Sequence, residues 1–171
     1  SIDKKPVVVL VAKTALDREG ILEYLTATGN LEFVETMDAA LASSLSELEV
    51  LVSLMAKLCY KSLTLGHNTN ITRVRDIESN IAAAISSGHG SVLEHASLSF
   101  IVRDCSRVYT HELVRHRAGT AFSQNSGRFI RLDSIDLVVD PILSPVAAEL
   151  QEIAEFIEQK YAVMADKLGM N

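Results

Sequence analysis

The side chains best suited to chemistry in this sequence are six arginines that lie between residues 103 and 131. This segment has no lysine and only two acidic residues, so its net charge is +4. Since the whole chain of 171 residues carries −6, the remainder carries −10. Arginine binds a phosphate or a carboxylate through two parallel hydrogen bonds, whereas lysine offers only a point charge. The segment therefore predicts a site for an anionic ligand; the alternative is a helix face that pairs with acidic helices elsewhere in the chain.

A polar loop follows three residues of this segment, Arg115-His116-Arg117. Residues 119–127 combine glycine, which allows close approach of a backbone, with serine, glutamine and asparagine side chains, and Arg128 comes next. Because the carbonyl groups at a helix C-terminus repel an anion, we expect N–H groups of the loop to bind it. No histidine and acid are arranged in an elbow motif around Ser126, so we expect this serine to bind a ligand rather than to attack one.

Two histidines in the same segment raise the question of a metal site. His111 and Glu112 resemble the beginning of the HExxH pattern of zinc proteases, but the next histidine, His116, comes five positions after the first. Five helical steps of about 100° place the two rings roughly 140° apart, so they cannot share one ion. The sequence predicts no metal site.

Composition excludes several other classes of protein. Two cysteines without a CxxC pair are too few for a disulfide framework. The apolar run at residues 7–12 is too short to cross a membrane or to form a signal-peptide core. The basic segment has few aromatic side chains that could stack on bases, so we expect no nucleic-acid partner. These features favour a soluble, cytoplasmic protein that binds neither a membrane nor nucleic acid.

Hydrophobic periodicity predicts the elements of the N-terminal half. The β-branched run at residues 7–11 is typical of a buried strand, and a second short strand is expected at residues 31–35. From Asp38 onward, apolar residues recur every three or four positions, which predicts one long helix capped by Asp38 and extending to Cys59. Lys57 falls on the polar face of that helix.

The middle of the chain contains clear helix boundaries. Asp76 is the expected cap of a helix that begins at Ile77 and ends at Gly88. Alternation over residues 93–102 predicts a strand with one buried face. We expect Asp104 to cap a further helix over residues 105–117.

The C-terminal part is predicted to contain a strand at residues 129–139 and a last helix. Ser144 and Pro145 open that helix in the preferred order of cap and proline, an apolar stripe follows, and Gly169 ends it. No repeat or linker divides the chain. We therefore expect one domain over residues 1–171 with an α+β fold, in which an antiparallel or mixed sheet packs against long helices.

Three ordered segments resemble the flavin-dependent thymidylate synthases, the ThyX family. Arg115-His116-Arg117 followed by Ser126-Gly127-Arg128 resembles the family signature of RHR, seven residues and Ser, although eight residues separate Arg117 from Ser126 here. Residues 88–95, GHGSVLEH, resemble the family's GHxTxxEH stretch. Residues 56–60, AKLCY, resemble its AARxCY helix segment.

The resemblance implies a reaction and an assembly. The family methylates dUMP to dTMP with 5,10-methylenetetrahydrofolate as carbon donor, FAD as cofactor and NADPH as reductant. All of these ligands carry phosphate or carboxylate groups, which agrees with the arginine-rich segment. The family is homotetrameric, with flavin sites shared between subunits. The alternative is a non-catalytic nucleotide- or flavin-binding module of the same fold.

The resemblance also assigns roles to individual residues. Those implied to bind the flavin are Ser91, Arg115, His116, Arg117, Gln124 and Cys59. Those implied to bind dUMP are Glu112, Arg115, Gln124, Asn125, Ser126, Gly127 and Arg128. Glu112 stands where the family usually has Gln, and a carboxylate there requires a proton or an arginine partner. His89 and Ser126 are the catalytic candidates, although His89 also suits an exposed turn, and the place of Cys59 on the apolar stripe also suits the core.

The family pattern extends beyond the motifs that are present. After a long helix, its members carry a second conserved stretch with asparagine and arginine residues for the flavin and the uracil ring. We find no such stretch after the last predicted helix here. We therefore expect this chain to lack that C-terminal stretch, to bind flavin weakly and not to turn over.

Overall fold

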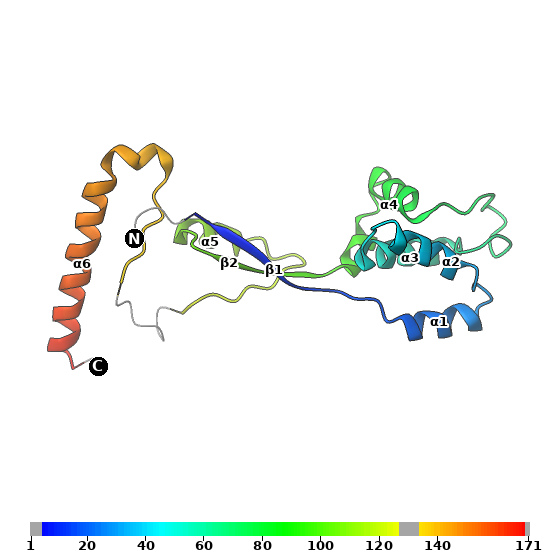
Figure 1. Ribbon diagram of the computed structural model, residues 1–171, viewed down its shortest axis with the longest axis horizontal. Coiled ribbons are helices and arrows are strands. Elements are labelled where there is room, and N and C mark those ends of the chain that lie inside the picture. The colour runs from blue at the N-terminus through cyan, green and yellow to red at the C-terminus, as the bar shows by residue number, and fades with distance from the viewer. Residues whose placement is uncertain (1–4, 127–133, 170–171) are drawn as a thin grey trace. The chain divides into compact units, whose positions relative to one another are not determined.

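The computed structural model describes residues 5–126 and 134–169, and the chain divides into two compact units. One unit is Leu10–Phe100, and the other combines Ser1–Val9 with Ile101–Asn171. In chain order the elements are β1 Val7–Lys13, α1 Arg18–Ala27, α2 Phe33–Ala42, α3 Glu47–Tyr60, α4 Ile77–Ser86, the 3-10 helix η1 Gly90–His95, β2 Leu98–Arg103, α5 Arg107–Leu113, the 3-10 helix η2 Pro141–Val146 and α6 Ala147–Lys167 (Figure 1). The predicted α+β class is confirmed.

The described sheet consists of β1 and β2. Thr14, just after β1, donates its N–H to the carbonyl of Ser97 at 3.0 Å, and Ser97 N donates to Thr14 Oγ1 at 2.9 Å. The end of one strand thus lies beside the start of the other, so the pair is antiparallel. The prediction of a strand at residues 7–11 is confirmed, but its burial is wrong. Val8 is 61% exposed, because no second layer of the described residues covers this part of the two-stranded sheet.

Residues 31–60 form two helices rather than a strand and one long helix. The predicted strand at 31–35 is wrong, because Phe33 begins α2 and its ring is buried in the core. The predicted cap at Asp38 is also wrong, because Asp38 lies inside α2 and pairs with Arg18 at 2.7 Å. A new helix begins after Ser46. The side chain of Ser46 accepts a hydrogen bond from Glu49 N at 3.3 Å, and Glu49 Oε2 accepts one from Ser46 N at 2.7 Å. This capping box fixes the start of α3.

The main core lies between α1, α2, α3 and α4, and its buried members are Leu25, Phe33, Met37, Ala40, Val50, Leu54, Leu63 and Ile77. A second cluster joins α3 to α4 and η1 through Val52, Ala56, Ala84 and Val92. Because neighbours pack against α3 on more than one side, its buried face is wider than the predicted stripe. Cys59 is exposed rather than buried, and Lys57, predicted on the polar face, is 1% exposed.

The boundaries of α4 are as predicted. The Asp76 side chain accepts from Ser79 N at 2.7 Å, and Gly88 takes a positive φ of 70° just after the helix. The predicted strand at 93–102 begins only at Leu98, because residues 90–95 form η1. This tight turn brings Val92 into the second cluster.

The arginine-rich segment begins with a helix shorter than predicted. Ser106 caps α5, accepting from Tyr109 N at 3.1 Å, instead of Asp104, which adopts a positive φ of 57°. The helix ends at Leu113 rather than at residue 117. Residues 115–117 therefore follow the helix and do not belong to it.

The long C-terminal helix begins differently from the prediction. Asp140 accepts from Ile142 N at 2.9 Å and opens η2, so Ser144 and Pro145 lie inside this turn rather than opening α6. Residues 129–133 of the predicted strand lie outside the described residues, and residues 134–139 contain one isolated bridge instead of a strand. The end at Gly169 is confirmed by its positive φ of 63°.

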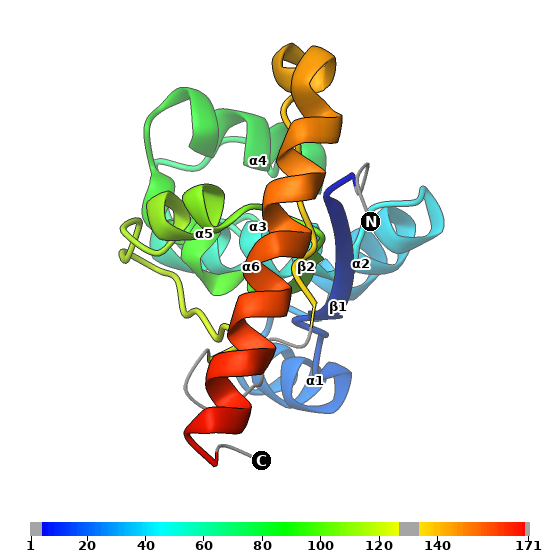
Figure 2. The same ribbon diagram turned by 90° about the vertical axis from the view of Figure 1, so that its left-hand side faces the viewer.

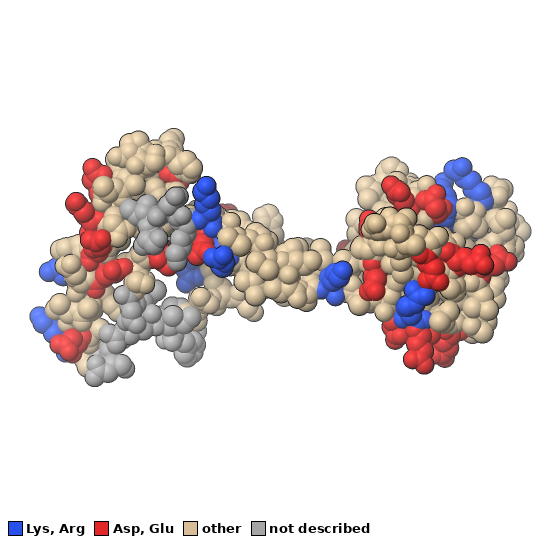
Figure 3. Space-filling view, in the orientation of Figure 1, with Lys and Arg blue, Asp and Glu red and all other residues tan. Residues whose placement is uncertain are grey.

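The predicted apolar stripe of α6 is largely exposed. The helix is continuous over its 21 residues (Figure 2), and its buried residues are Ala154 and Ala165. Ile153 and Met164 of this stripe are each more than half exposed. Acidic side chains follow α6 and gather over α1 (Figure 3), in keeping with the acidic remainder of the sequence.

Candidate functional site

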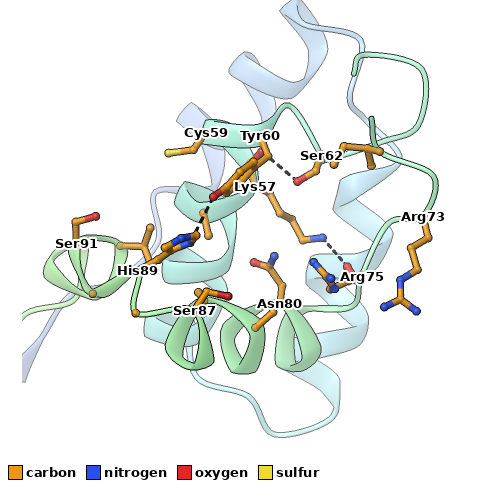
Figure 4. A pocket seen from close by; sticks show the side chains of 17 residues that line it. Lys57, Cys59, Tyr60, Ser62, Arg73, Arg75, Asn80, Ser87, His89 and Ser91 are labelled. Carbon is orange, nitrogen blue, oxygen red and sulfur yellow. Dashed lines mark hydrogen bonds between the residues drawn. The ribbon is translucent and has the colours of Figure 1, made fainter. Parts of the chain in front are cut away.

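A cavity of about 760 Å³ lies within the Leu10–Phe100 unit. Its walls come from the C-terminal half of α3, from α4, from the turn at residues 88–92 and from the segment at residues 71–75 (Figure 4). The polar and charged side chains that line it are Lys57, Cys59, Tyr60, Ser62, Arg73, Arg75, Asn80, Ser87, His89 and Ser91. Its apolar lining includes Ala56, Ala84 and Val92 of the second core cluster, so packing between α3 and α4 sets its shape.

Lys57 reaches this cavity from the buried side of α3. Its Nζ donates to the backbone carbonyl of Arg75 at 2.5 Å and lies 5.9 Å from the centre of the Phe33 ring. Burial lowers the pKa of the Lys57 ammonium below its ordinary value; the Asp76 carboxylate opposes the shift and the charge of Arg75 adds to it. The ammonium thus links the core to the backbone of the segment that precedes α4.

An aromatic pair forms another part of the wall. The rings of Tyr60 and His89 are stacked at an interplanar angle of 22° with their centres 6.2 Å apart. Tyr60 Oη lies 3.4 Å from His89 Nδ1 (Figure 4). The backbone N–H of His89 donates to Ala84 O at 2.9 Å, which anchors the histidine to the end of α4. The pair offers flat surfaces against which a planar ring can stack.

The charge of the cavity is one-sided. Three cationic side chains, Lys57, Arg73 and Arg75, line it, and none of the described residues in its wall is aspartate or glutamate. Cationic side chains in a concave wall raise the local concentration of an anion. The cavity therefore suits an anionic ligand with a planar ring.

The structure places the predicted site residues in two groups. Cys59, His89 and Ser91 line the same cavity. The others belong to the unit that contains Ile101–Asn171; those within the described residues are Glu112, Arg115, His116, Arg117, Gln124, Asn125 and Ser126. Gly127 and Arg128 lie outside the described residues. Each group is therefore considered separately as a candidate ligand-binding region.

Local contacts organise the second group. Arg115 Nη1, three residues further along the chain, lies 3.6 Å from Glu112 Oε1 and supplies the arginine partner that a carboxylate at this position requires. Both side chains are exposed, so the pair contributes little to stability. Gln124 Nε2 donates to Thr110 Oγ1 at 2.7 Å, which ties the loop to α5. Among the described residues, no group of three or more His, Cys, Asp and Glu side chains is arranged to hold a metal ion.

Sequence reasoning missed Tyr60, Arg73 and Arg75. Tyr60 ended the AKLCY segment, but only its neighbour Cys59 received a role. Arg73 and Arg75 stand two positions apart just before the cap Asp76. Their position next to a helix cap was the signal that could have identified them, but sequence reasoning considered only the larger arginine cluster at residues 103–131.

Comparison with known proteins identifies the family. Residues 40–170 match the family described as thymidylate synthase complementing protein. This chain is a member of that family. The match covers α3, α4, the GHGSVLEH segment and the arginine-rich segment, so it contains both groups of candidate site residues.

Curated relatives carry the name flavin-dependent thymidylate synthase. One from Pyrococcus furiosus is 36% identical over 95 residues, 56% of this chain and 37% of the relative. One from Clostridium tetani is 31% identical over 127 residues, 66% of this chain and 51% of the relative. One from Mycobacteroides abscessus is 33% identical over 121 residues, 69% of this chain and 46% of the relative. The matches thus span between about a third and a half of each relative. Within residues 5–126 and 134–169, no helix is long and apolar enough to span a membrane.

Proposed function

We propose that this member of the family takes part in FAD-dependent methylation of dUMP to dTMP, with 5,10-methylenetetrahydrofolate as carbon donor and NADPH as reductant. The observation that carries the proposal is the family match over residues 40–170, which includes all three motif segments. The cationic cavity and the arginine-rich segment support it, because each ligand of this reaction is an anion.

The described residues fit a flavin in two respects. The cavity joins a stacked aromatic pair to cationic side chains, and a flavin nucleotide joins a planar ring to phosphate groups. Bound FAD would supply the redox chemistry of the reaction. Ser91 and His89 would contact it from the cavity. Arg115, His116 and Arg117 of the other unit are a separate group of candidate flavin-binding residues.

The remaining predicted residues would hold the nucleotide. In this proposal the hydroxyl of Ser126 and the loop around it bind dUMP, and Arg128 forks onto its phosphate. Gln124 would orient the loop through its bond to Thr110. The protein's own contribution is then positioning and electrostatic stabilisation, with no nucleophilic serine.

We propose further that the chain assembles as a homotetramer with sites shared between subunits. The support is the exposed apolar surface of β1, β2 and α6, which a partner could cover. Light scattering over a range of protein concentrations tests this proposal. A monomer at every concentration would contradict it.

Flavin titration tests the proposed reaction. FAD added to the purified chain should lose fluorescence on binding. R115Q/R117Q should weaken binding about tenfold or more, because each substitution removes a charge-assisted hydrogen bond. R107Q is the matched control, since Arg107 lies on α5 outside the motif, and it should change affinity by less than about twofold.

The outcomes separate the candidate functions. Formation of dTMP from dUMP with all cofactors present supports the enzyme. Binding of FAD and dUMP without dTMP formation favours the non-catalytic module of the same fold. Binding of dUMP without any flavin binding also favours the module, and absence of both flavin and dUMP binding overturns both candidates.

A further inference from the structure

Arg73 and Arg75 are the charged side chains of the cavity wall that lie outside the motif segments. Both line the cavity of the Leu10–Phe100 unit, and both are exposed. Within the described part of the chain, neither guanidinium takes part in a hydrogen bond or an ion pair. Unpaired arginines in a concave wall are available to a ligand.

The backbone of this segment is held in place from two directions. Lys57 Nζ donates to the carbonyl of Arg75 at 2.5 Å from the buried side of α3. Directly afterwards, Asp76 caps α4, and Ile77 lies in the main core. Although the arginine side chains are exposed, the chain that carries them is therefore fixed, which lowers the entropy cost of binding a ligand.

Carboxylates near the two arginines do not neutralise them. Asp76 uses its oxygens to accept from the N–H of Ser79 at 2.7 Å and from its hydroxyl at 2.8 Å. The guanidinium of Arg75 instead repels the buried ammonium of Lys57. An anion between Arg73 and Arg75 would relieve this repulsion as well as gain two charged hydrogen-bonding partners.

We propose that Arg73 and Arg75 form an anion subsite that takes the phosphate or carboxylate group of a ligand whose planar ring lies on the Tyr60–His89 pair. Figure 4 shows the aromatic pair and the two arginines on different sides of the same cavity, with Asn80 between them. Lys57 acts as a positioning residue for the subsite. The subsite deepens the proposed function, because the ligands of that reaction combine such a ring with such a group.

The test compares R73Q/R75Q with R18Q in the full chain. Arg18 is an exposed arginine of the same unit that pairs with Asp38 and does not line the cavity, so R18Q controls for loss of charge. The probes are inorganic pyrophosphate for a phosphate source and a triglutamate peptide for a carboxylate source, each titrated by calorimetry at low salt. We expect R73Q/R75Q to lower the affinity for at least one probe about tenfold or more. R18Q should lower the affinity for neither probe by more than about twofold.

The two probes identify the source of the anion. Loss confined to pyrophosphate assigns the subsite to a phosphate, and loss confined to triglutamate assigns it to a carboxylate. Equal affinity of R73Q/R75Q and R18Q for both probes overturns the proposal. If Lys57 positions the subsite, K57M should lower the affinity for the same probe, and K57R, which keeps the charge and the donor, should retain that affinity. Low affinity of K57R, with a fold that circular dichroism shows to be intact, refutes the positioning role.

Titration with riboflavin and FAD distinguishes failure of the subsite from failure of the proposed function. Riboflavin carries the ring without phosphate, whereas FAD carries both. If the chain binds pyrophosphate through Arg73 and Arg75 but binds no FAD, the subsite stands and the proposed function fails. If FAD binds and R73Q/R75Q leaves pyrophosphate, triglutamate and FAD affinities unchanged, the proposed function stands and the subsite fails.

Discussion

Replacement of the buried Lys57 should change how stability depends on alkaline pH. Burial holds the pKa of its ammonium below the ordinary value of 10.5. Between the lowered pKa and 10.5 the unfolded chain therefore binds more protons than the folded chain. The free energy of unfolding must rise with pH in that window, by at most about 1.4 kcal/mol per pH unit for one proton. In K57M this rise is absent, and in K57R it is absent because arginine stays protonated throughout the window.

The same residue gives an expected magnitude at neutral pH. Its bond to the Arg75 carbonyl involves a charged donor and is worth about 1.5–3 kcal/mol, and its removal leaves a carbonyl without that partner. Relief of the buried charge offsets part of this loss. We expect K57M to lower the free energy of unfolding at pH 7 by about 1–3 kcal/mol, and K57R to lower it less, because arginine retains donors for the carbonyl.

Urea denaturation followed by far-ultraviolet circular dichroism, from pH 7 to pH 10, measures both effects. The decisive quantity is the difference in free energy of unfolding between wild type and each variant, because contributions that the three proteins share cancel in it. This difference should grow with pH for K57M and for K57R. Parallel curves for the three proteins across the alkaline range would refute the assignment of a destabilised ammonium to Lys57.

Two further predictions concern the folded core and its helices. D76A should lower the free energy of unfolding by about 1 kcal/mol through loss of the α4 cap. The N–H and hydroxyl of Ser79 hold the pKa of Asp76 below its ordinary value of 3.8, so the stabilisation is fully present above that value and is lost as pH falls through the lowered pKa. D76N should accordingly lose less stability than wild type between pH 5 and pH 2, and an identical acid response in urea denaturation would count against the cap. F33A should lower the free energy of unfolding by about 3–5 kcal/mol, because Phe33 is completely buried. V108A, at a side chain that is 76% exposed, should change it by less than about 0.5 kcal/mol, and similar free energies of unfolding for the two variants would show that Phe33 is not a core residue.

Helix ends could be predicted from the sequence where a single capping residue or glycine determines them. Asp76, Gly88 and Gly169 mark the ends of α4 and α6 because their preferences act within one helical turn. The same logic failed at Asp38 because apolar periodicity continued through the break between α2 and α3. Ser46 with Glu49 three positions later was the competing signal, and it decided the structure.

The cavity itself could not be predicted in the same way. Its wall joins Tyr60 to His89 and Lys57 to Arg75, pairs that are 29 and 18 residues apart, so it depends on how α3 packs against α4. The burial of Lys57 follows from the same packing, because a helix with neighbours on several sides has no fully polar face. The motif residues Cys59, His89 and Ser91 could be singled out by type, but their common cavity is a tertiary feature.

Pairing of β1 with β2 has a consequence for the order of folding. Thr14 and Ser97 are 83 residues apart, and closing a flexible loop of that length costs about 4 kcal/mol of chain entropy. Contacts among α1–α4 arise inside this loop and shorten it, so the strands should join after the helices have packed. During synthesis at about 5–20 residues per second, the first strand therefore waits roughly 4–17 s for its partner to emerge. Throughout that interval the backbone N–H and C=O groups of the first strand stay without their strand partner, and its valines stay exposed to solvent.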